Sequence, residues 1–312
     1  MKQPQDVSGD ADDALVVRPA RPADRDAVAT LCERAWSAGD YVRDVWQMWI
    51  DEDAAEQGVV LLAERDGELL GVTHMRMVSD DEGWIEAIRV DPSARRQGIA
   101  RRLTSRALVA ARERGAAVVR LAVDADNVAS QVLAARFGFT RVAELLRYRA
   151  PASEQGEQAG PVISVLTASD VDFERIWAWL EQSTLTPLNG GVEIEDRAAR
   201  AITEPLLRAR LTAGDVKLIE ELGTIAALAL LAEPALTDES HEARVLEVTY
   251  LTGTSEGIGR LALALRRLAF ERNLAEVKLW LPDLLILRDA MDGAGYAIPE
   301  GDQPLYLYAR AL

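Results

Sequence analysis

The residues best suited to chemistry lie in a short basic loop between a run of strand formers and a long amphipathic helix. The strand formers cover 84–90 and stop at Asp91-Pro92, and apolar residues at helical spacing begin at Ile99. A strand, a glycine-bearing loop and a helix N-terminus favour anion binding, because unpaired N–H groups and the helix dipole point the same way. Gly98 lets the backbone approach an anion closely. The predicted phosphate-binding residues are Arg95, Arg96, Gln97, Gly98, Ile99, Ala100 and Arg101. The alternative is an ordinary connection with a solvated arginine cluster.

Glu86 is the candidate general base. By strand alternation, Trp84, Glu86, Ile88 and Val90 are expected to point to one face of a sheet. A carboxylate between apolar neighbours loses solvation, which would raise its pKa toward the range useful for taking a proton from an amine. The alternative is a structural carboxylate that pairs with an arginine or reaches solvent at the strand end.

Aromatic residues before this strand are candidates for binding an acceptor. Tyr41, Val45, Met48 and Trp49 fall at helical spacing, which is typical of core packing, whereas Trp46 lies off that stripe. Tyr41 and Trp46 are therefore the candidate substrate-binding residues, with core packing as the alternative for Tyr41.

Composition limits the classes of function. A net charge of −16 argues against nucleic-acid binding. The charge is uneven, because residues 91–150 carry a balance of +7 and residues 1–90 one of −11. This distribution fits a polyanionic ligand at the loop and a cationic amine elsewhere. No apolar run is long enough to span a bilayer, and a single cysteine, Cys32, suits a cytoplasmic protein. One cysteine and two distant histidines make a metal site improbable.

The two halves of the chain have the same order of predicted strands and helices. After a polar start (1–13), expected to be disordered, the order of predicted strands and helices over 14–150 recurs over 162–312, and 151–161 has the composition of a linker. In the second half, further helix is predicted around 194–212, interrupted at Pro205. An antiparallel meander, a crossover helix and a parallel strand predict an α/β fold, with a mixed twisted sheet flanked by helices on both faces in each half.

The spacing Arg95-x-x-Gly98-x-Ala100, after a strand ending in Val-Asp-Pro, resembles motif A of the GCN5-related N-acetyltransferases, the GNAT family. Residues 15–24 look like the opening strand and first helix of that family, and residues 127–139 resemble its closing motif. The resemblance covers most of residues 14–149. It implies two tandem GNAT-like domains, with acetyl-coenzyme A as co-substrate and its pyrophosphate on the basic loop.

The resemblance also implies roles for single residues. The backbone around Arg89, at Ile88 and Val90, would bind the pantetheine arm as a strand partner, and Asn127 would hydrogen-bond it or cap the following helix. The tyrosine with which the family often protonates the thiolate is replaced by Ala134, so the general acid stays open. Further candidates for the acid are Arg89 and Tyr148.

The second half departs from the motif. Thr254 stands where the first half has Arg95, Glu256 replaces Gln97, and no counterpart of Asn127 is present. A carboxylate beside phosphates would weaken binding. We therefore expect residues 14–150 to bind acetyl-coenzyme A and residues 162–312 to be a degenerate copy. Mycothiol synthases resemble this tandem layout but keep their working site in the second copy, which counts against that identity.

Together these features predict an acetyl-coenzyme A-dependent N-acetyltransferase that acts directly on a primary amine of a small molecule. The expected partners are that amine alone, without nucleic acid or membrane, and the protein is expected to be a monomer or homodimer. The alternatives are acetylation of a protein or peptide N-terminus and a non-catalytic module that binds acetyl-coenzyme A.

Overall fold

A computed structural model describes the chain at residues 15–35, 40–154, 165–195, 198–232, 235–236 and 244–312. The predicted tail (1–13) and most of the predicted linker (155–161) lie outside these residues. The chain forms two compact units. Unit 1 comprises residues up to Leu121 with Ala135–Gly138 and Ala309–Leu312, and unit 2 comprises Ala122–Ala134 and Phe139–Tyr308.

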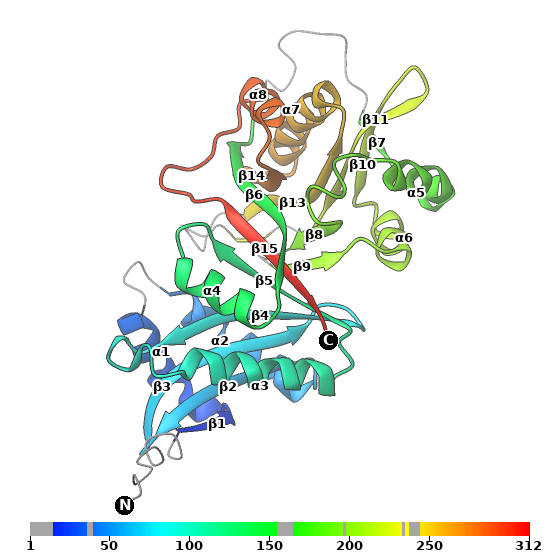
Figure 1. The fold of residues 1–312 in the computed structure, drawn as a ribbon. Coiled ribbons are helices and arrows are strands. Elements are labelled where there is room, and N and C mark those ends of the chain that lie inside the picture. Colours follow the sequence, from blue (N-terminus) through cyan, green and yellow to red (C-terminus); the bar gives the residue numbers. More distant parts are fainter. Residues whose placement is uncertain (1–14, 36–39, 155–164, 196–197, 233–234, 237–243) are drawn as a thin grey trace, which may run out of the picture. The chain divides into compact units, whose positions relative to one another are not determined.

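Unit 1 is built on a sheet with helices on both faces. Strands β1 to β4 form an antiparallel meander, and β5 then pairs parallel to β4. Helices α1 and α2 pack on one face and α3 on the other (Figure 1). The bounds are β1 Leu15–Pro19, α1 Arg25–Ala35, α2 Val42–Ala54, β2 Gly58–Arg65, β3 Glu68–Met77, β4 Glu82–Val90, α3 Ile99–Glu113 and β5 Val118–Asp124.

Strand alternation explains how both faces are covered. Val60, Leu62 and Val72 belong to a buried cluster with residues of α1 and α2. Gly71, one residue before Val72, faces α3 instead, since a Cβ there would lie 2.9 Å from a side-chain carbon of Ile99. This glycine therefore lets α3 pack close to the sheet. Each strand divides its side chains between two helical layers, as the predicted architecture requires.

Unit 2 has the strand order β15-β6-β14-β13-β11-β10-β7, with β12 paired to β13. Strand β6 pairs antiparallel with β14, although β6 belongs to the first half of the sequence. Conversely, Leu312 at the chain end donates a backbone hydrogen bond to Ala117 within unit 1 (2.9 Å). Each unit thus includes a segment from the other half of the sequence, and the domain boundaries near residues 150 and 162 stay a prediction.

The remaining elements follow the predicted order closely. Their bounds are α4 Val128–Arg136, β6 Thr140–Pro151, β7 Leu166–Thr167, α5 Phe173–Glu181, β8 Val192–Glu195, β9 Ala198–Ala201, α6 Glu204–Ala213, β10 Val216–Glu221, β11 Thr224–Leu231, β12 Ala235–Leu236, β13 Arg244–Gly253, α7 Ser255–Glu271, β14 Glu276–Pro282, α8 Leu285–Gly293 and β15 Leu305–Ala311. None of the described helices is long and apolar enough to cross a membrane.

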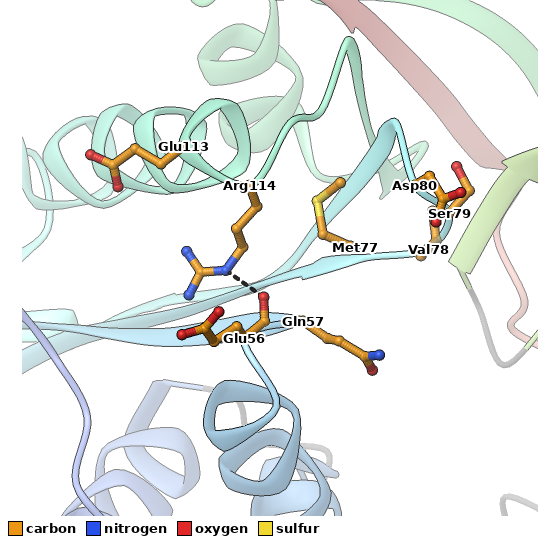
Figure 2. A pocket seen from close by; sticks show the side chains of 8 residues that line it. All are labelled: Glu56, Gln57, Met77, Val78, Ser79, Asp80, Glu113 and Arg114. Carbon is orange, nitrogen blue, oxygen red and sulfur yellow. Dashed lines mark hydrogen bonds between the residues drawn. The ribbon is translucent and has the colours of Figure 1, made fainter.

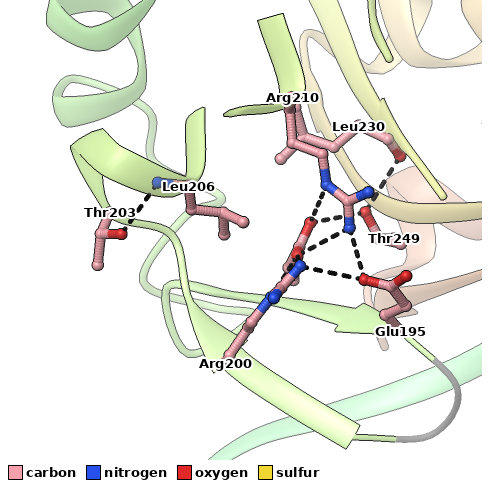
Figure 3. Close-up of polar contacts among 8 residues, drawn as sticks. Glu195, Arg200, Thr203, Leu206, Arg210, Leu230 and Thr249 are labelled. Carbon is pink, nitrogen blue, oxygen red and sulfur yellow. Dashed lines mark hydrogen bonds and ion pairs between the residues drawn. The ribbon is translucent and has the colours of Figure 1, made fainter. Parts of the chain in front are cut away.

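The helix predicted over 194–212 is wrong in its first part, which is the hairpin β8–β9; only Glu204–Ala213 is helical. A buried ion cluster explains the difference. The Glu193 carboxylate is fully buried on β8 and accepts hydrogen bonds from Arg200 on β9 and Arg210 on α6. Both arginines also donate to Glu195 (Figure 3). Thr249 on β13 donates to the same carboxylate (2.9 Å). These tertiary contacts override the local helical pattern.

Candidate active site

The basic loop ends in an open helix N-terminus. Arg96 and Gly98 both have positive φ angles, of 64° and 81°, and Gly98 is the N-cap of α3 without a side-chain cap. The first intrahelical bond runs from the Arg102 N–H to the Gly98 carbonyl (3.0 Å). In the described part of the chain, the N–H groups of residues 99–101 donate to no side chain. The loop therefore has the backbone geometry of an anion site, as predicted.

Several side chains hold the loop in this conformation. The Asp91 carboxylate accepts hydrogen bonds from the side chain and the backbone of Ser93 and pairs with Arg34. These contacts, led by the Ser93 hydroxyl, lower the pKa of Asp91. Arg95 donates to the carbonyl of Ala35 (3.0 Å).

The remaining polar side chains of the loop differ in their contacts, although all of them are exposed. The side-chain oxygen of Gln97 accepts from Arg65 (2.8 Å). Arg96 and Arg101 are exposed. Of the predicted arginines, these two are the ones best placed for a ligand.

Beyond its first three residues, β4 has an open edge. Its pairing with β5 covers only Glu82, Gly83 and Trp84. Over the rest of β4, no strand pairs with this side in the described part of the chain. The stretch includes Ile88 and Val90, whose backbone groups were predicted to bind an amide-containing arm.

A β-bulge at Ala87 changes which residues of β4 share a face. Ala87 has a φ of 52°, and the register with β3 shifts between Val72, which pairs with Arg89, and His74, which pairs with Glu86. Because Val72 and His74 point to the same face, Glu86 and Arg89 also do. The prediction that Glu86 shares a face with Ile88 and Val90 is therefore wrong, since it assumed unbroken alternation.

Glu86 is surrounded by polar groups rather than apolar ones. Its side chain is 15% exposed, and Oε1 lies 3.1 Å from His74 Nδ1. Tyr41 donates its hydroxyl to Oε2 (3.3 Å), and Arg76 Nε lies 3.6 Å from Oε1. Burial acts to raise the pKa of Glu86, but the contacts with His74, Arg76 and Tyr41 outweigh it and lower that pKa. The predicted rise in the pKa of Glu86 is thus wrong.

Sequence reasoning missed His74 and Glu52. The His74 ring is fully buried, stacks on Trp49 (4.3 Å between centroids) and places Nε2 3.2 Å from Glu52 Oε2. A signal was available in the hairpin of β3 and β4, whose register sets His74 directly opposite Glu86. Glu52, near the end of α2, comes to His74 only through the packing of that helix on the sheet.

The two candidate acceptor-binding residues, Tyr41 and Trp46, have different surroundings. Tyr41 contacts Glu86 and meets Trp49 edge to face (6.1 Å). Trp46 is 2% exposed and packs in the core with Leu31 and Cys32. The prediction that Trp46 lines a pocket is therefore wrong: α2 is buried along Trp46 and Trp49.

Three further sequence candidates belong to unit 2. Asn127 accepts a hydrogen bond from the backbone N–H of Ser130 (3.1 Å), which is the capping role considered for it. Ala134 is buried. Tyr148 lies in the core of unit 2, and its hydroxyl is buried without a hydrogen-bond partner in the described part of the chain. Burial raises the pKa of Tyr148 to about 12. Its role as general acid stays untested.

A polar pocket at the C-terminal end of α3 holds none of the predicted site residues. Figure 2 shows Arg114 donating to the backbone carbonyl of Glu56 (3.1 Å) across it. The lining residues are Glu56, Gln57, Met77, Val78, Ser79, Asp80, Glu113 and Arg114. Because Gly98 is at the opposite end of α3, this pocket is separate from the predicted anion site.

Unit 2 repeats the bulged strand pair with different residues. Leu230 pairs with Tyr250 and Leu231 with Val248, which is the same one-residue register shift. The bulge lies further along the strand in unit 2: counted from the tight turns, His74 corresponds to Leu230, so Leu230 and Tyr250 stand where unit 1 has His74 and Glu86. Both are buried.

Comparisons with known proteins match part of the chain to acetyltransferases. Residues 25–139 match the Acetyltransferase (GNAT) family. A mycothiol acetyltransferase from Thermomonospora curvata is 35% identical over 117 residues, which are 38% of each chain. One from Salinispora tropica is 32% identical over 152 residues, 44% of this chain and 48% of that protein. The chain thus matches less than half the length of these curated relatives.

A solved structure extends the likeness in fold to nearly the whole chain. The GCN5-related N-acetyltransferase from Sphaerobacter thermophilus superposes with a TM-score of 0.63 over 96% of each chain, at 16% identity. At that identity the likeness concerns the fold alone.

Proposed function

Because residues 25–139 belong to the Acetyltransferase (GNAT) family, we propose that the protein transfers an acetyl group from acetyl-coenzyme A directly to a primary amine of a small molecule. The proposal places the active site in unit 1. The relatives named mycothiol acetyltransferase support an acetyl transfer of this kind. Under this proposal residues 162–312 carry no second active site. The protein is further proposed to be cytoplasmic, which the single, buried Cys32 fits.

The open N-terminus of α3 is the observation that carries the proposal. A Cβ at Gly98 would come no closer than 4.0 Å to its nearest neighbour, the Arg101 guanidinium, so the loop leaves room for a ligand. The N–H groups of residues 99–101 would hold a pyrophosphate, and Arg96 and Arg101 would neutralise its charge. The open edge of β4 would bind the pantetheine amides.

Glu86 is the proposed base. Acetyl-coenzyme A supplies the thioester carbonyl, and the acceptor must present a neutral nitrogen to it. With a lowered pKa, Glu86 is ionised at neutral pH, so it attracts an ammonium group and takes one of its protons. Tyr41 holds the carboxylate through Oε2 and lines the side from which the acceptor would approach. No side chain is assigned as general acid.

Calorimetry with acetyl-coenzyme A tests the binding part. Arg96→Ala with Arg101→Ala should weaken the affinity about tenfold, since two charge-assisted contacts are lost. Arg106→Ala is the matched control, because Arg106 is exposed on the same helix and pairs with Glu113. An absence of heat with the wild-type protein would refute acetyl-coenzyme A as the co-substrate.

Transfer to a panel of small amines tests the catalytic part. Glu86→Gln should lower kcat/KM about 100-fold or more and leave acetyl-coenzyme A affinity unchanged. Glu113→Gln, an exposed change in the same unit, should leave both unchanged. Full activity of Glu86→Gln would remove Glu86 from the mechanism. Tight acetyl-coenzyme A binding without transfer to any amine would instead support a non-catalytic module.

A further inference from the structure

A carboxylate and a guanidinium lie close together on the face of β4 that α1 and α2 cover. Val72 on β3 belongs to the buried cluster with these two helices, and His74 follows it on the same face. Their partners on β4 are Arg89 and Glu86, which therefore also face the helices. Because the two β3 residues are two positions apart, the side chains of Arg89 and Glu86 start about 7 Å from each other.

Tyr41 contacts both charged groups. Its hydroxyl donates to Glu86 Oε2 (3.3 Å), and Arg89 Cζ lies 6.0 Å from the centroid of its ring. The Glu86 side chain is 15% exposed and that of Arg89 17%, so each is largely buried and still reaches solvent. The two charges are therefore accessible to a small molecule beside the ring of Tyr41.

A buried carboxylate holds the guanidinium of Arg89 in place. Arg89 Nε donates to Asp40 Oδ2 (2.6 Å), and the Asp40 side chain is only 2% exposed. The other oxygen of Asp40 accepts from the backbone N–H of Val42 at the start of α2 (3.0 Å). A guanidinium has five N–H donors in one plane, so a bond through Nε orients it without using its whole capacity. An oriented guanidinium is suited to binding a carboxylate through two parallel hydrogen bonds.

The second guanidinium on this face is less suited to an anionic group. Arg76 lies 3.6 Å from both Glu52 and Glu86. A ligand carboxylate at Arg76 would approach these two carboxylates and be repelled by them. At Arg89 the neighbouring Asp40 is buried, so a ligand would meet the guanidinium on the side away from it. Arg89 is therefore the better partner for a carboxylate of the ligand.

Unit 2 has no charged pair at the corresponding positions. Tyr250 and Thr252 are the residues paired there with β11. The Tyr250 hydroxyl bonds to that of Thr186 (2.7 Å), and the Thr252 hydroxyl to that of Ser183 (2.9 Å). The packing of the repeat thus does not require a carboxylate and a guanidinium at these two positions. Their presence in unit 1 points to a ligand.

We propose that the acceptor is a free α-amino acid, whose ammonium group binds Glu86 and whose carboxylate binds Arg89. This inference rests on the proposed function and names its substrate class. An α-amino acid carries both groups on one carbon, and a hydrogen bond of about 2.8 Å at each end lets it bridge two side chains at this spacing. A peptide N-terminus has no carboxylate so close to its amine and would leave the guanidinium unmatched.

The carboxylate contact fixes which nitrogen reacts. With the carboxylate on Arg89, the α-ammonium group lies at Glu86 and gives one proton to it, which leaves a neutral amine. The amine nitrogen bonds to the thioester carbonyl carbon, its second proton goes to the departing thiolate, and the carbon–sulfur bond breaks. Glu86 then releases its proton to solvent. The products are the N-acetyl amino acid, the free thiol and one proton.

Acceptors that differ only at the carboxylate test the inference. Leucine, leucinamide and isopentylamine form one matched set, and phenylalanine, phenylalaninamide and phenethylamine another. With the wild-type protein, kcat/KM for the free acid should exceed that for the amide about 100-fold, because the amide leaves the guanidinium unmatched. The amide has the lower amine pKa, since it lacks the carboxylate charge, so reactivity alone would favour the amide. Lysine should be acetylated on its α-nitrogen.

Two variants test whether Arg89 provides this preference. Arg89→Lys keeps a charge for the buried Asp40 but lacks the planar fork, and the preference for acid over amide should fall to about tenfold. In Arg89→Gln it should fall to about threefold or less, mainly through a higher KM for the acid. Arg43→Gln is the control and should keep the wild-type preference, because Arg43 is exposed on α2 and lies 3.8 Å from Glu33. A merely structural role of Arg89 would lower kcat/KM for acid and amide alike and leave their ratio unchanged.

Several outcomes overturn this inference and leave the proposed function standing. A wild-type protein that acetylates amides or simple amines as well as free acids has no carboxylate site. Lysine acetylated on its ε-nitrogen, or an unchanged acid preference in Arg89→Gln, would also refute the arrangement. If Arg89→Gln does not fold, Arg89→Lys and the wild-type acceptor sets decide. A wild-type protein that acetylates no amine refutes the proposed function itself.

Discussion

The two glycine-bearing helix starts of this protein have similar sequences but different surroundings. At α3, Gly98 has a positive φ, no side-chain cap and open space around it. At α7, the Thr254 hydroxyl caps the helix by accepting from the Gly257 N–H (3.0 Å). A Cβ at Gly257 would lie 2.6 Å from the backbone oxygen of Ala226. The first glycine leaves room for a ligand, and the second lets a helix pack on a strand.

The strand pairs beside these helices differ in their side chains. In unit 1, β4 and β5 pair only as far as Trp84, and the polar pair His74–Glu86 follows. In unit 2, β13 and β14 pair from Val245 to Val248, and the corresponding residues are Leu230 and Tyr250, which belong to a buried cluster with α5 and α6. The second copy thus keeps the repeat as a packing unit, and the polar pair is a feature of unit 1. The difference supports placing the proposed chemistry there.

The largest expected effect comes from giving unit 1 the residues of unit 2. His74→Leu with Glu86→Tyr should lower kcat/KM about 1,000-fold or more, because the base and the histidine that contacts it are both lost. Acetyl-coenzyme A affinity by calorimetry should stay within about threefold. Met75→Leu, a change of similar volume at a buried neighbour, is the control. Retained transfer activity would contradict the contrast between the two copies.

A smaller effect is expected on stability from the second glycine. Gly257→Ala should lower the free energy of unfolding by about 2 kcal/mol, because the new Cβ meets the backbone of Ala226. Gly98→Ala should cost about 1 kcal/mol, from its positive φ alone, and should also weaken acetyl-coenzyme A binding. Urea unfolding measures both. Equal effects on binding from the two variants would mean that the glycines have the same role.

A charge change at the loop should have a more modest effect. Gln97→Glu introduces the carboxylate that unit 2 carries at Glu256, and we expect about tenfold weaker acetyl-coenzyme A binding through repulsion of the phosphates. Gln57→Glu makes the same change at an exposed position near the other end of α3 and should bind normally. Unchanged affinity of Gln97→Glu, measured by calorimetry, would argue against phosphates at this loop.

The smallest effect concerns stability at acidic pH. The folded-state pKa of Glu86 is lowered, so its ionised form stabilises unit 1 above the unfolded value and that contribution is lost as the pH falls through the folded one. The difference in unfolding free energy between wild type and Glu86→Gln should therefore shrink as the pH falls from 6 toward 3.5. A difference that grows toward acid would reverse the sign of the pKa shift.

Local patterns predicted much of the fold. A long amphipathic helix was expected from Ile99 onward, and α3 is observed over Ile99–Glu113; the strand formers at 84–90 lie within β4. These elements are strongly periodic, with turn residues at their ends. The errors fell where tertiary contacts decide. Ala87 breaks strand alternation with a bulge, and buried Glu193 joins a hairpin to α6 where a helix was predicted.

By itself the sequence determined the order of elements, the basic loop at Gly98 and the polar character of Glu86, because each depends on residues close together in the chain. Only the tertiary structure decided the surroundings of Glu86. His74 faces it through strand pairing, and Glu52 reaches that histidine through the packing of α2 on the sheet. The pKa of a buried carboxylate depends on such neighbours more than on burial alone, and its neighbours here come from distant parts of the chain.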